Sequence, residues 1–179
     1  MASDKEETGI LIPDECRHWI HLQRPESKYE EELKADFRQI EPFLQEKVES
    51  ILDIGCGMAG IDVYLKRKFP DSKLYLLDGD GEKAKYGWNA VSTPYNSRKS
   101  TEALLKANGF AVDKWFDIGT KEELKADLII SLLSWGFHYP LNTYKVSGFC
   151  IADLRIGHGE VNGKLIHRAQ KYNRVAFRC

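Results

Sequence analysis

Apolar positions form short continuous runs from residue 50 onward, and more polar stretches separate them. The runs cover residues 50–54, 73–77, 113–116, 127–133 and 149–153. Continuous apolar runs of this length are typical of strands buried on both faces of a parallel sheet. The intervening stretches 61–69 and 98–108 predict helices, which Pro70 and Gly109 end. This alternation predicts an α/β fold, a doubly wound and mostly parallel sheet with helices on both faces.

The chain before residue 49 predicts helices and no strand. Apolar residues between 29 and 44 follow helical spacing, and Pro42 kinks this helix or divides it in two. Ser27 and Glu30 have the spacing of a capping box. We expect one domain over residues 1–179, with residues 1–48 as a helical segment or lid and residues 49–179 as the α/β core.

The region after residue 117 is predicted from weaker signals. Thr120 and Glu123 have the spacing of a capping box over one helical turn. Residues 164–172 predict a helix and residues 174–178 a last strand. A helix with solvated cations explains the basic residues there, which are Lys164, His167, Arg168, Lys171, Arg174 and Arg178.

Composition narrows the class of protein. The chain has 179 residues, 42% of them apolar and 30% charged, and its net charge is −1. This balance is ordinary for a globular domain and supplies no general attraction for nucleic acid or anionic lipid. No apolar run is long enough for a membrane span, and the first residues do not read as a signal peptide. The four cysteines form no CxxC pair, so we expect no metal site, no disulfide framework and a cytoplasmic setting.

The strongest chemical signal is a glycine loop after the first strand. Gly55, Gly57 and Gly60 have the GxGxxG spacing, which lets the backbone approach a ligand at the start of a helix. Asp78 ends the second strand 18 residues past Gly60. That is close to the spacing of about 20 residues at which an acid accepts ribose hydroxyls. Asp53 in this loop suits a cationic head group and would repel the pyrophosphate of a dinucleotide.

These residues carry a resemblance to a known family. DIGCGMAG (53–60) followed by LYLLDGD (74–80) resembles the first two motifs of class I S-adenosylmethionine-dependent methyltransferases. The resemblance covers residues 49–155 and is strongest over the first thirty. A looser similarity to small bacterial methyltransferases found with sugar and polysaccharide enzymes rests on residues 94–110 and 134–140.

The resemblance implies S-adenosylmethionine as cofactor, S-adenosylhomocysteine as product, and a role for each matching residue. Asp53 and Gly55 would lie by the methionine moiety, and Asp78 would accept both ribose hydroxyls. Asp117 would accept the adenine amino group and Ile118 would pack on the ring, although an acid in such a loop is also common without that role. The implied cofactor-binding residues are Asp53, Gly55, Cys56, Gly57, Asp78, Gly79, Asp117, Ile118, Leu133 and Ser134.

The chain also departs from the family pattern. Only residues 139–148 connect the fourth and fifth strands, where the family has a full helix. The carboxy-terminal hairpin of two strands is also cut down to one. We therefore expect a minimised variant with a shortened crossover and a reduced C-terminal hairpin.

Residues after the fourth strand are the candidate catalytic groups, because ligands in such sheets lie beyond the carboxyl ends of the strands. His138 could act as a general base, and Tyr139 lies beside it in the sequence. A structural histidine is the alternative. Trp135, Phe137 and Tyr139 would form an aromatic acceptor pocket or pack under the crossover. Asp153 and Arg155 would either bind an acceptor hydroxyl or pair with each other, and pairing is the favoured interpretation.

The sequence therefore predicts a cytoplasmic methyltransferase that acts on a small molecule, with a sugar-linked hydroxyl as one candidate acceptor. Two alternatives stay open: a non-catalytic module that binds the cofactor, and a nucleic-acid or protein methyltransferase. The balanced charge speaks against nucleic acid. The segment with His18, Trp19, His21 and Arg24 is either a lid, in which Arg24 meets the cofactor carboxylate, or surface decoration.

Overall fold

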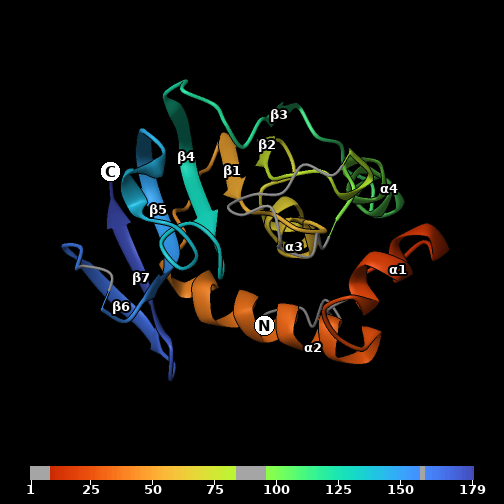
Figure 1. The fold of residues 1–179 in the computed structure, drawn as a ribbon, viewed down its shortest axis with the longest axis horizontal. Helices are drawn as coiled ribbons and strands as arrows, with labels where there is room; N and C mark the ends of the chain where they lie inside the picture. The colour runs from red at the N-terminus through yellow and green to blue at the C-terminus, as the bar shows by residue number, and fades with distance from the viewer. Residues whose placement is uncertain (1–8, 84–95, 158–159) are drawn as a thin grey trace.

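The computed structural model describes residues 9–83, 96–157 and 160–179 and contains one seven-stranded sheet (Figure 1). The strands lie in the order β3-β2-β1-β4-β5-β7-β6. Their bounds are β1 Ser50–Ile54, β2 Lys73–Leu77, β3 Lys114–Phe116, β4 Leu124–Ser131, β5 Val146–Arg155, β6 Gly163–Arg168 and β7 Tyr172–Arg178. Strands β1 to β5 pair in parallel, whereas β7 is antiparallel to both β5 and β6. The predicted α/β class and mostly parallel sheet are confirmed.

The α-helices of the described residues cover one face of the sheet, whereas the sequence predicted helices on both faces. They are α1 Asp14–His21, α2 Glu26–Ile40, α3 Gly60–Lys68 and α4 Arg98–Ala107. All four contribute to a core with sheet residues such as Ile51 and Ile130. The core on the other face, around Leu52 and Ile129, contains no residue of these helices. None of the helices in the described part of the chain is long and apolar enough to cross a membrane.

Short connections explain why the second face has no α-helix among the described residues. Residues 117–123 join β3 to β4, and residues 132–145 join β4 to β5 with only the 3₁₀ turn Leu141–Thr143. The shortened crossover is therefore confirmed. Its side chains cover the sheet in place of a helix: Trp135 is 1% exposed, and its indole N–H donates to the Leu141 carbonyl at 2.9 Å.

Elements around the glycine loop match the sequence prediction closely. Strands β1 and β2 have the predicted bounds, and α3 and α4 begin and end within one residue of theirs. Ser97 caps α4 by accepting from the Ser100 N–H, and Gly109 follows the helix at φ +86°. These signals are local, so tertiary contacts did not have to override them.

The C-terminal region is a complete antiparallel hairpin, which corrects two predictions. Residues 164–172 are not a helix, because β6 and β7 occupy them and a turn between Ala169 and Tyr172 joins the strands. The hairpin is therefore not reduced to one strand. Pairing of β7 with β5 from Phe149 to Arg155 supplies a ladder that outweighs the helical propensity of this stretch.

Both predicted capping boxes are absent. Helix α2 begins at Glu26 after Pro25, and its N-terminus has no side-chain cap. The proline carbonyl accepts from the Lys28 and Tyr29 N–H groups, so Ser27 lies inside the first turn. Thr120 accepts from the Glu122 N–H at 3.2 Å in a turn before β4, not in a helix.

Candidate functional site

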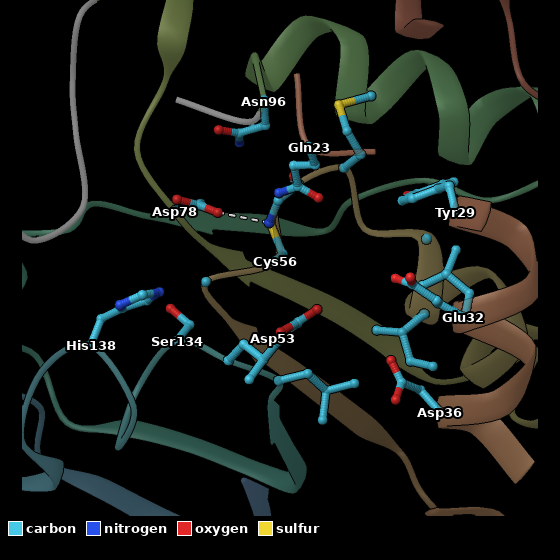
Figure 2. A pocket seen from close by; sticks show the side chains of 18 of the residues that line it. Gln23, Tyr29, Glu32, Asp36, Asp53, Cys56, Asp78, Asn96, Ser134 and His138 are labelled. Carbon is cyan, nitrogen blue, oxygen red and sulfur yellow. Dashed lines mark hydrogen bonds between the residues drawn. The ribbon is translucent and has the colours of Figure 1, made fainter. Parts of the chain in front are cut away.

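A cavity of about 610 Å³ lies at the carboxyl ends of β1, β2 and β4 (Figure 2). This size is within the roughly 300–1,000 Å³ typical of small-molecule sites. The glycine loop, α2 and the residues after β4 form its walls. Its lining includes Leu22, Gln23, Arg24, Tyr29, Glu32, Leu33, Ala35, Asp36, Asp53, Gly55, Cys56, Gly57, Met58, Asp78, Asn96, Ile118, Leu132, Leu133, Ser134, His138, Tyr139, Tyr172 and Arg174. Most of the predicted cofactor residues therefore meet in one place.

Two glycines of the loop are required for different reasons. Gly55 has φ +78°, and a Cβ there would lie 1.8 Å from the Ser134 Oγ, so only glycine lets the loop pass this close to the end of β4. Gly57 has φ +53°, but a Cβ there would meet no atom within 4 Å. The space beside the Gly57 Cα is therefore open, and Gly57 is one of the residues that line the cavity.

Asp78 lies at the end of β2 and holds the glycine loop in place. Its two carboxylate oxygens accept from the N–H groups of Gly57 and Gly79, each at 2.7 Å. Burial raises the pKa of Asp78, and these two N–H donors and Arg98 oppose the shift. The carboxylate still lines the cavity, where its further lone pairs can accept from a ligand.

Asp53 forms the floor of the cavity with a second acid beneath it. Asp53 is 3% exposed, and Asp62 on α3 is fully buried. Burial raises the pKa of both carboxyls, and each interacts with the other. Burial also raises the pKa of the Cys56 thiol, so this cysteine is not a reactive thiolate. An acidic floor of this kind suits a cationic group.

The structure separates the two residues predicted to bind adenine. Ile118 lines the cavity, whereas Asp117 does not. The Asp117 side chain is 62% exposed and lies 3.3 Å from Arg98. The role of Asp117 stays a prediction, and Ile118 is in position to pack on a planar ligand.

The end of β4 contains a strained residue that sequence reasoning placed only by resemblance. Leu133 has φ +54°, which is uncommon for a residue other than glycine, and its side chain lines the cavity. Its N–H donates to the Asp153 carboxylate at 3.1 Å. Backbone strain of this kind persists where surrounding contacts hold it, as Asp153 does here.

Arg174 on β7 is the partner of Asp153, which corrects the predicted pair of Asp153 and Arg155. The guanidinium of Arg174, 1% exposed, donates to both Asp153 oxygens at 2.7 and 3.0 Å. It also donates to Asp36 of α2 at 2.7 Å and to Gln39 at 3.0 Å. The Arg155 guanidinium instead lies over the Phe137 ring, 5.6 Å from its centre. Arg174 thereby joins α2 to β5 and to the end of β4.

Helix α2 supplies a wall of the cavity that sequence reasoning missed. Tyr29, Glu32, Leu33 and Asp36 recur at i, i+3, i+4 and i+7 and line the cavity together. Arg24 also lines it and pairs with Glu32, whereas the role of residues 1–48 as a lid stays a prediction. The helical spacing of Tyr29 and Leu33 was visible in the sequence and could have indicated the acids beside them.

The candidate catalytic residues lie across the cavity from α2. Figure 2 shows His138 and Ser134 on one side, Glu32 and Asp36 on the other, and Asp53 between them. Burial and the charge of Arg155 lower the pKa of His138, so its imidazole is neutral at pH 7. Tyr139 lies 3.1 Å from Ser134, oxygen to oxygen, and burial raises the pKa of its phenol.

The predicted aromatic acceptor pocket is wrong for two of its three members. Tyr139 lines the cavity, but Trp135 and Phe137 do not. Trp135 packs into the core under the crossover. Phe137 makes an edge-to-face contact with His138, with ring centres 4.9 Å apart, and so packs against the imidazole of the candidate base.

Several solved structures share this fold. One is assigned as a methyltransferase from Pseudomonas syringae, with 12% identity, 84% of this chain and 99% of that chain covered, and a TM-score of 0.51. A second is a ribosomal protein L11 methylase from Lactobacillus delbrueckii subsp. bulgaricus, with 14% identity, 79% and 76% covered, and a TM-score of 0.51. A third is the O-methyltransferase region of StiE, with 14% identity, 81% and 54% covered, and a TM-score of 0.50.

These likenesses have a defined extent. The chain spans about half the length of the StiE structure and nearly all of the Pseudomonas one. No family model and no curated protein sequence matches the chain. At such low identity a shared arrangement of strands is evidence for the fold alone. The chain has the class I methyltransferase fold.

Proposed function

We propose that this protein is an S-adenosylmethionine-dependent methyltransferase acting on a small-molecule acceptor. The observation that supports it most is the loop of Asp53, Gly55 and Gly57 at the floor of a 610 Å³ cavity, with Asp78 at the end of the next strand. Open space beside Gly57 and an acid buried in the floor are what an adenosine ligand with a cationic amino acid would need.

The residues present fit the cofactor from one end of the cavity to the other. Ile118 would pack on the adenine, and Asp78 would accept the ribose hydroxyls while it keeps its bonds to the loop. Asp53 would face the ammonium group, because a buried carboxylate is stabilised by an adjacent cation. Arg24 is the candidate partner for the cofactor carboxylate, on the α2 side of the cavity.

The chemistry that the cofactor supplies is an electrophilic methyl group on sulfur. The task of the protein is then to align an acceptor in line with that group and to exclude water. Leu133 and Tyr139 would form the wall at the reacting carbon. His138, neutral at pH 7, would take the proton of a hydroxyl acceptor as the new bond forms.

A small acceptor fits the charge around the cavity better than a nucleic acid does. Glu32 and Asp36 line the α2 wall, and the cations Arg24 and Arg174 already pair with them. Phosphate groups would meet these carboxylates at close range and be repelled. A salt-dependent shift of RNA or DNA at low micromolar protein would contradict this acceptor class.

Two measurements test the proposal in sequence. Calorimetry should detect binding of S-adenosylhomocysteine and weaker or no binding of NAD; tighter binding of NAD would overturn the assignment. A panel of small hydroxyl and amine acceptors, sugars included, with a labelled methyl donor should then yield S-adenosylhomocysteine. Cofactor binding without turnover on any acceptor would favour the non-catalytic alternative.

Asp78→Ala should weaken S-adenosylhomocysteine binding by about 2–3 kcal/mol, the range for hydrogen bonds to a charged group. Two ribose hydroxyls would lose their acceptor, and the Gly57 N–H would lose its own. Calorimetry measures the dissociation constant, and a thermal melt confirms folding. Asp78→Asn keeps the shape of the side chain and one acceptor oxygen, so its dissociation constant should lie between those of the parent protein and Asp78→Ala. An unchanged constant in folded Asp78→Ala would remove Asp78 from the site.

Gly57→Val should impair binding while the protein stays folded. The side chain would fill the open space beside the Gly57 Cα, and φ +53° would add about 1–3 kcal/mol of backbone strain. A cooperative melt without detectable binding of S-adenosylhomocysteine is the expected pair of results. Gly109→Val, at φ +86° with no atom near its Cβ, is a matched control remote from the cavity. Equal affinity in both variants would reduce the loop to a structural turn.

A further inference from the structure

Asp62 on α3 is a buried acid that the proposed mechanism does not use. It is fully buried, and neither carboxyl oxygen accepts a hydrogen bond from a donor group of the described residues; the side chain within hydrogen-bond reach of it is another carboxyl, that of Asp53. Buried polar groups in folded proteins are almost always hydrogen-bonded, so such a carboxyl requires an explanation. Its neighbour is Asp53, 3% exposed, which forms the floor of the cavity.

The groups that face this pair supply little positive charge. The glycine loop contributes the Cys56 thiol, β2 contributes Asp78, and α2 contributes the Tyr29 phenol. The other charged or titratable groups lining the cavity are Glu32, Asp36, Arg24, Arg174, His138, Tyr139 and Tyr172. Both arginines are bonded to acids of their own, Arg24 to Glu32 and Arg174 to Asp153 and Asp36. The pair therefore lacks a dedicated cation within the described site.

Two neighbouring carboxyls in a buried site cannot both ionise without a large cost. Burial and the mutual repulsion of the two acids raise the pKa of Asp53 well above its ordinary value, and burial raises the pKa of Asp62 to about 7. In the empty protein, the less costly state has one proton on the pair. The two acids then behave as one unit, as coupled carboxyls do.

We propose that Asp53 and Asp62 together store one proton in the empty protein, and that the ammonium group of the bound cofactor displaces this proton to solvent. The inference rests on the proposed function, because that function brings the ammonium to Asp53. The step is a proton transfer: the O–H bond of one carboxylic acid breaks to leave a carboxylate, water takes the proton and forms a new O–H bond, and the ligand amino group stays protonated throughout. Asp62 thus does not contact the ligand. It is a positioning residue that acts through Asp53, because its carboxyl controls whether Asp53 is ionised when the ligand binds.

The consequence is selectivity for the amino group of the ligand. The ammonium group of a ligand stabilises the fully ionised pair and so offsets the free energy needed to remove its proton. A ligand without this cation leaves the proton bound to Asp53 and Asp62. Binding of the amino-bearing ligand should strengthen as the pH rises toward 7, because the empty site then holds the proton less firmly. Above that pH the affinity should level off, since the empty pair has already lost its proton.

Calorimetry of the full chain with S-adenosylhomocysteine and with its desamino analogue tests the proposal. The analogue keeps the ribose and the carboxylate, so any proton linked to Asp78 or to the arginines cancels between the two ligands. Titrations at pH 6 to 8 in buffers of different ionisation enthalpy count the protons released. We expect about one proton released with S-adenosylhomocysteine at pH 6, and an affinity that rises about tenfold from pH 6 to 8. The analogue should release about one proton fewer at pH 6 and lack this rise in affinity.

Asp62→Asn identifies the second member of the pair. Without the neighbouring charge, Asp53 should ionise at lower pH, so proton release at pH 6 should fall and the tenfold rise in affinity should flatten. Asp71→Asn, an exposed acid after the end of α3, is the matched control and should keep the parental profile.

The outcomes test separately whether the pair stores a proton, whether Asp62 takes part in storing it, and whether the protein binds the cofactor product at all. Equal proton release by both ligands overturns the stored proton, as does no release by either one. Unchanged release in folded Asp62→Asn overturns the part given to Asp62. If that variant does not fold, the comparison of the two ligands on the parent protein still decides the central claim. Absence of S-adenosylhomocysteine binding at every pH would instead overturn the proposed function.

Discussion

Arg174→Met is expected to lower the free energy of unfolding by about 3–5 kcal/mol, the cost of removing one partner of a buried ion pair. The Asp153 side chain is 0% exposed and would keep its charge without the guanidinium that now donates to both of its oxygens. The variant also loses the bonds that hold Asp36 and Gln39, and with them the attachment of α2 to β7. Urea denaturation of both proteins measures the difference.

Two further variants separate this loss from a general effect of removing an arginine. Arg155→Met should cost less than about 1 kcal/mol, because this arginine is exposed and lies over the Phe137 ring without a buried ion-pair partner among the described residues. Combining Arg174→Met with Asp153→Leu should regain part of the stability, because no unpaired charge then stays buried. If the free energy of unfolding of Arg174→Met alone is within about 1 kcal/mol of the parent value, then other contacts hold α2 in place.

His138→Gln is expected to lower turnover roughly 10²–10⁴-fold on a hydroxyl acceptor, the range for loss of a general base, and to leave S-adenosylhomocysteine binding unchanged. Glutamine can still donate and accept hydrogen bonds at this site but cannot take up a proton. The residue lines the cavity beyond the end of β4, on the side opposite α2, where the reacting carbon would lie. Initial rates with a saturating acceptor measure the effect.

The pH profile of the parent protein gives the same assignment a second readout. The pKa of His138 is lowered by burial and by Arg155, so the rate should fall only as the pH drops below 6.5. This acidic limb should disappear in His138→Gln. His18→Gln changes an exposed histidine outside the cavity and should leave both the rate and the limb intact. A parental rate in His138→Gln would leave alignment by Leu133 and Tyr139 as the source of catalysis.

The part of the site that could be predicted from the sequence is local. The strand, glycine loop and helix from Ser50 to Lys68 are contiguous in the chain, and Asp78 ends the next strand. Apolar runs, glycine spacing and an acid at a strand end each determine conformation within a few residues, so no distant contact is needed to interpret them. Most of the residues predicted to bind a cofactor line the cavity for that reason, whereas Gly79 and Asp117 are not among its lining residues.

Distant contacts decided the rest. Arg174 belongs to the strand that the sequence predicted over residues 174–178, but only the pairing of β7 with β5 places it opposite Asp153. Its ion-pair partners Asp153 and Asp36 are 21 and 138 residues away. Glu32 and Asp36 on α2 likewise line the cavity through tertiary contacts, because no residue near them in the sequence indicates which part of the sheet the helix covers. The sequence by itself determined the loop that would receive a cofactor and predicted that the residues after the fourth strand lie at the same edge of the sheet. Only the tertiary structure placed α2 and β7 around that loop, because their contacts join residues that are far apart in the sequence.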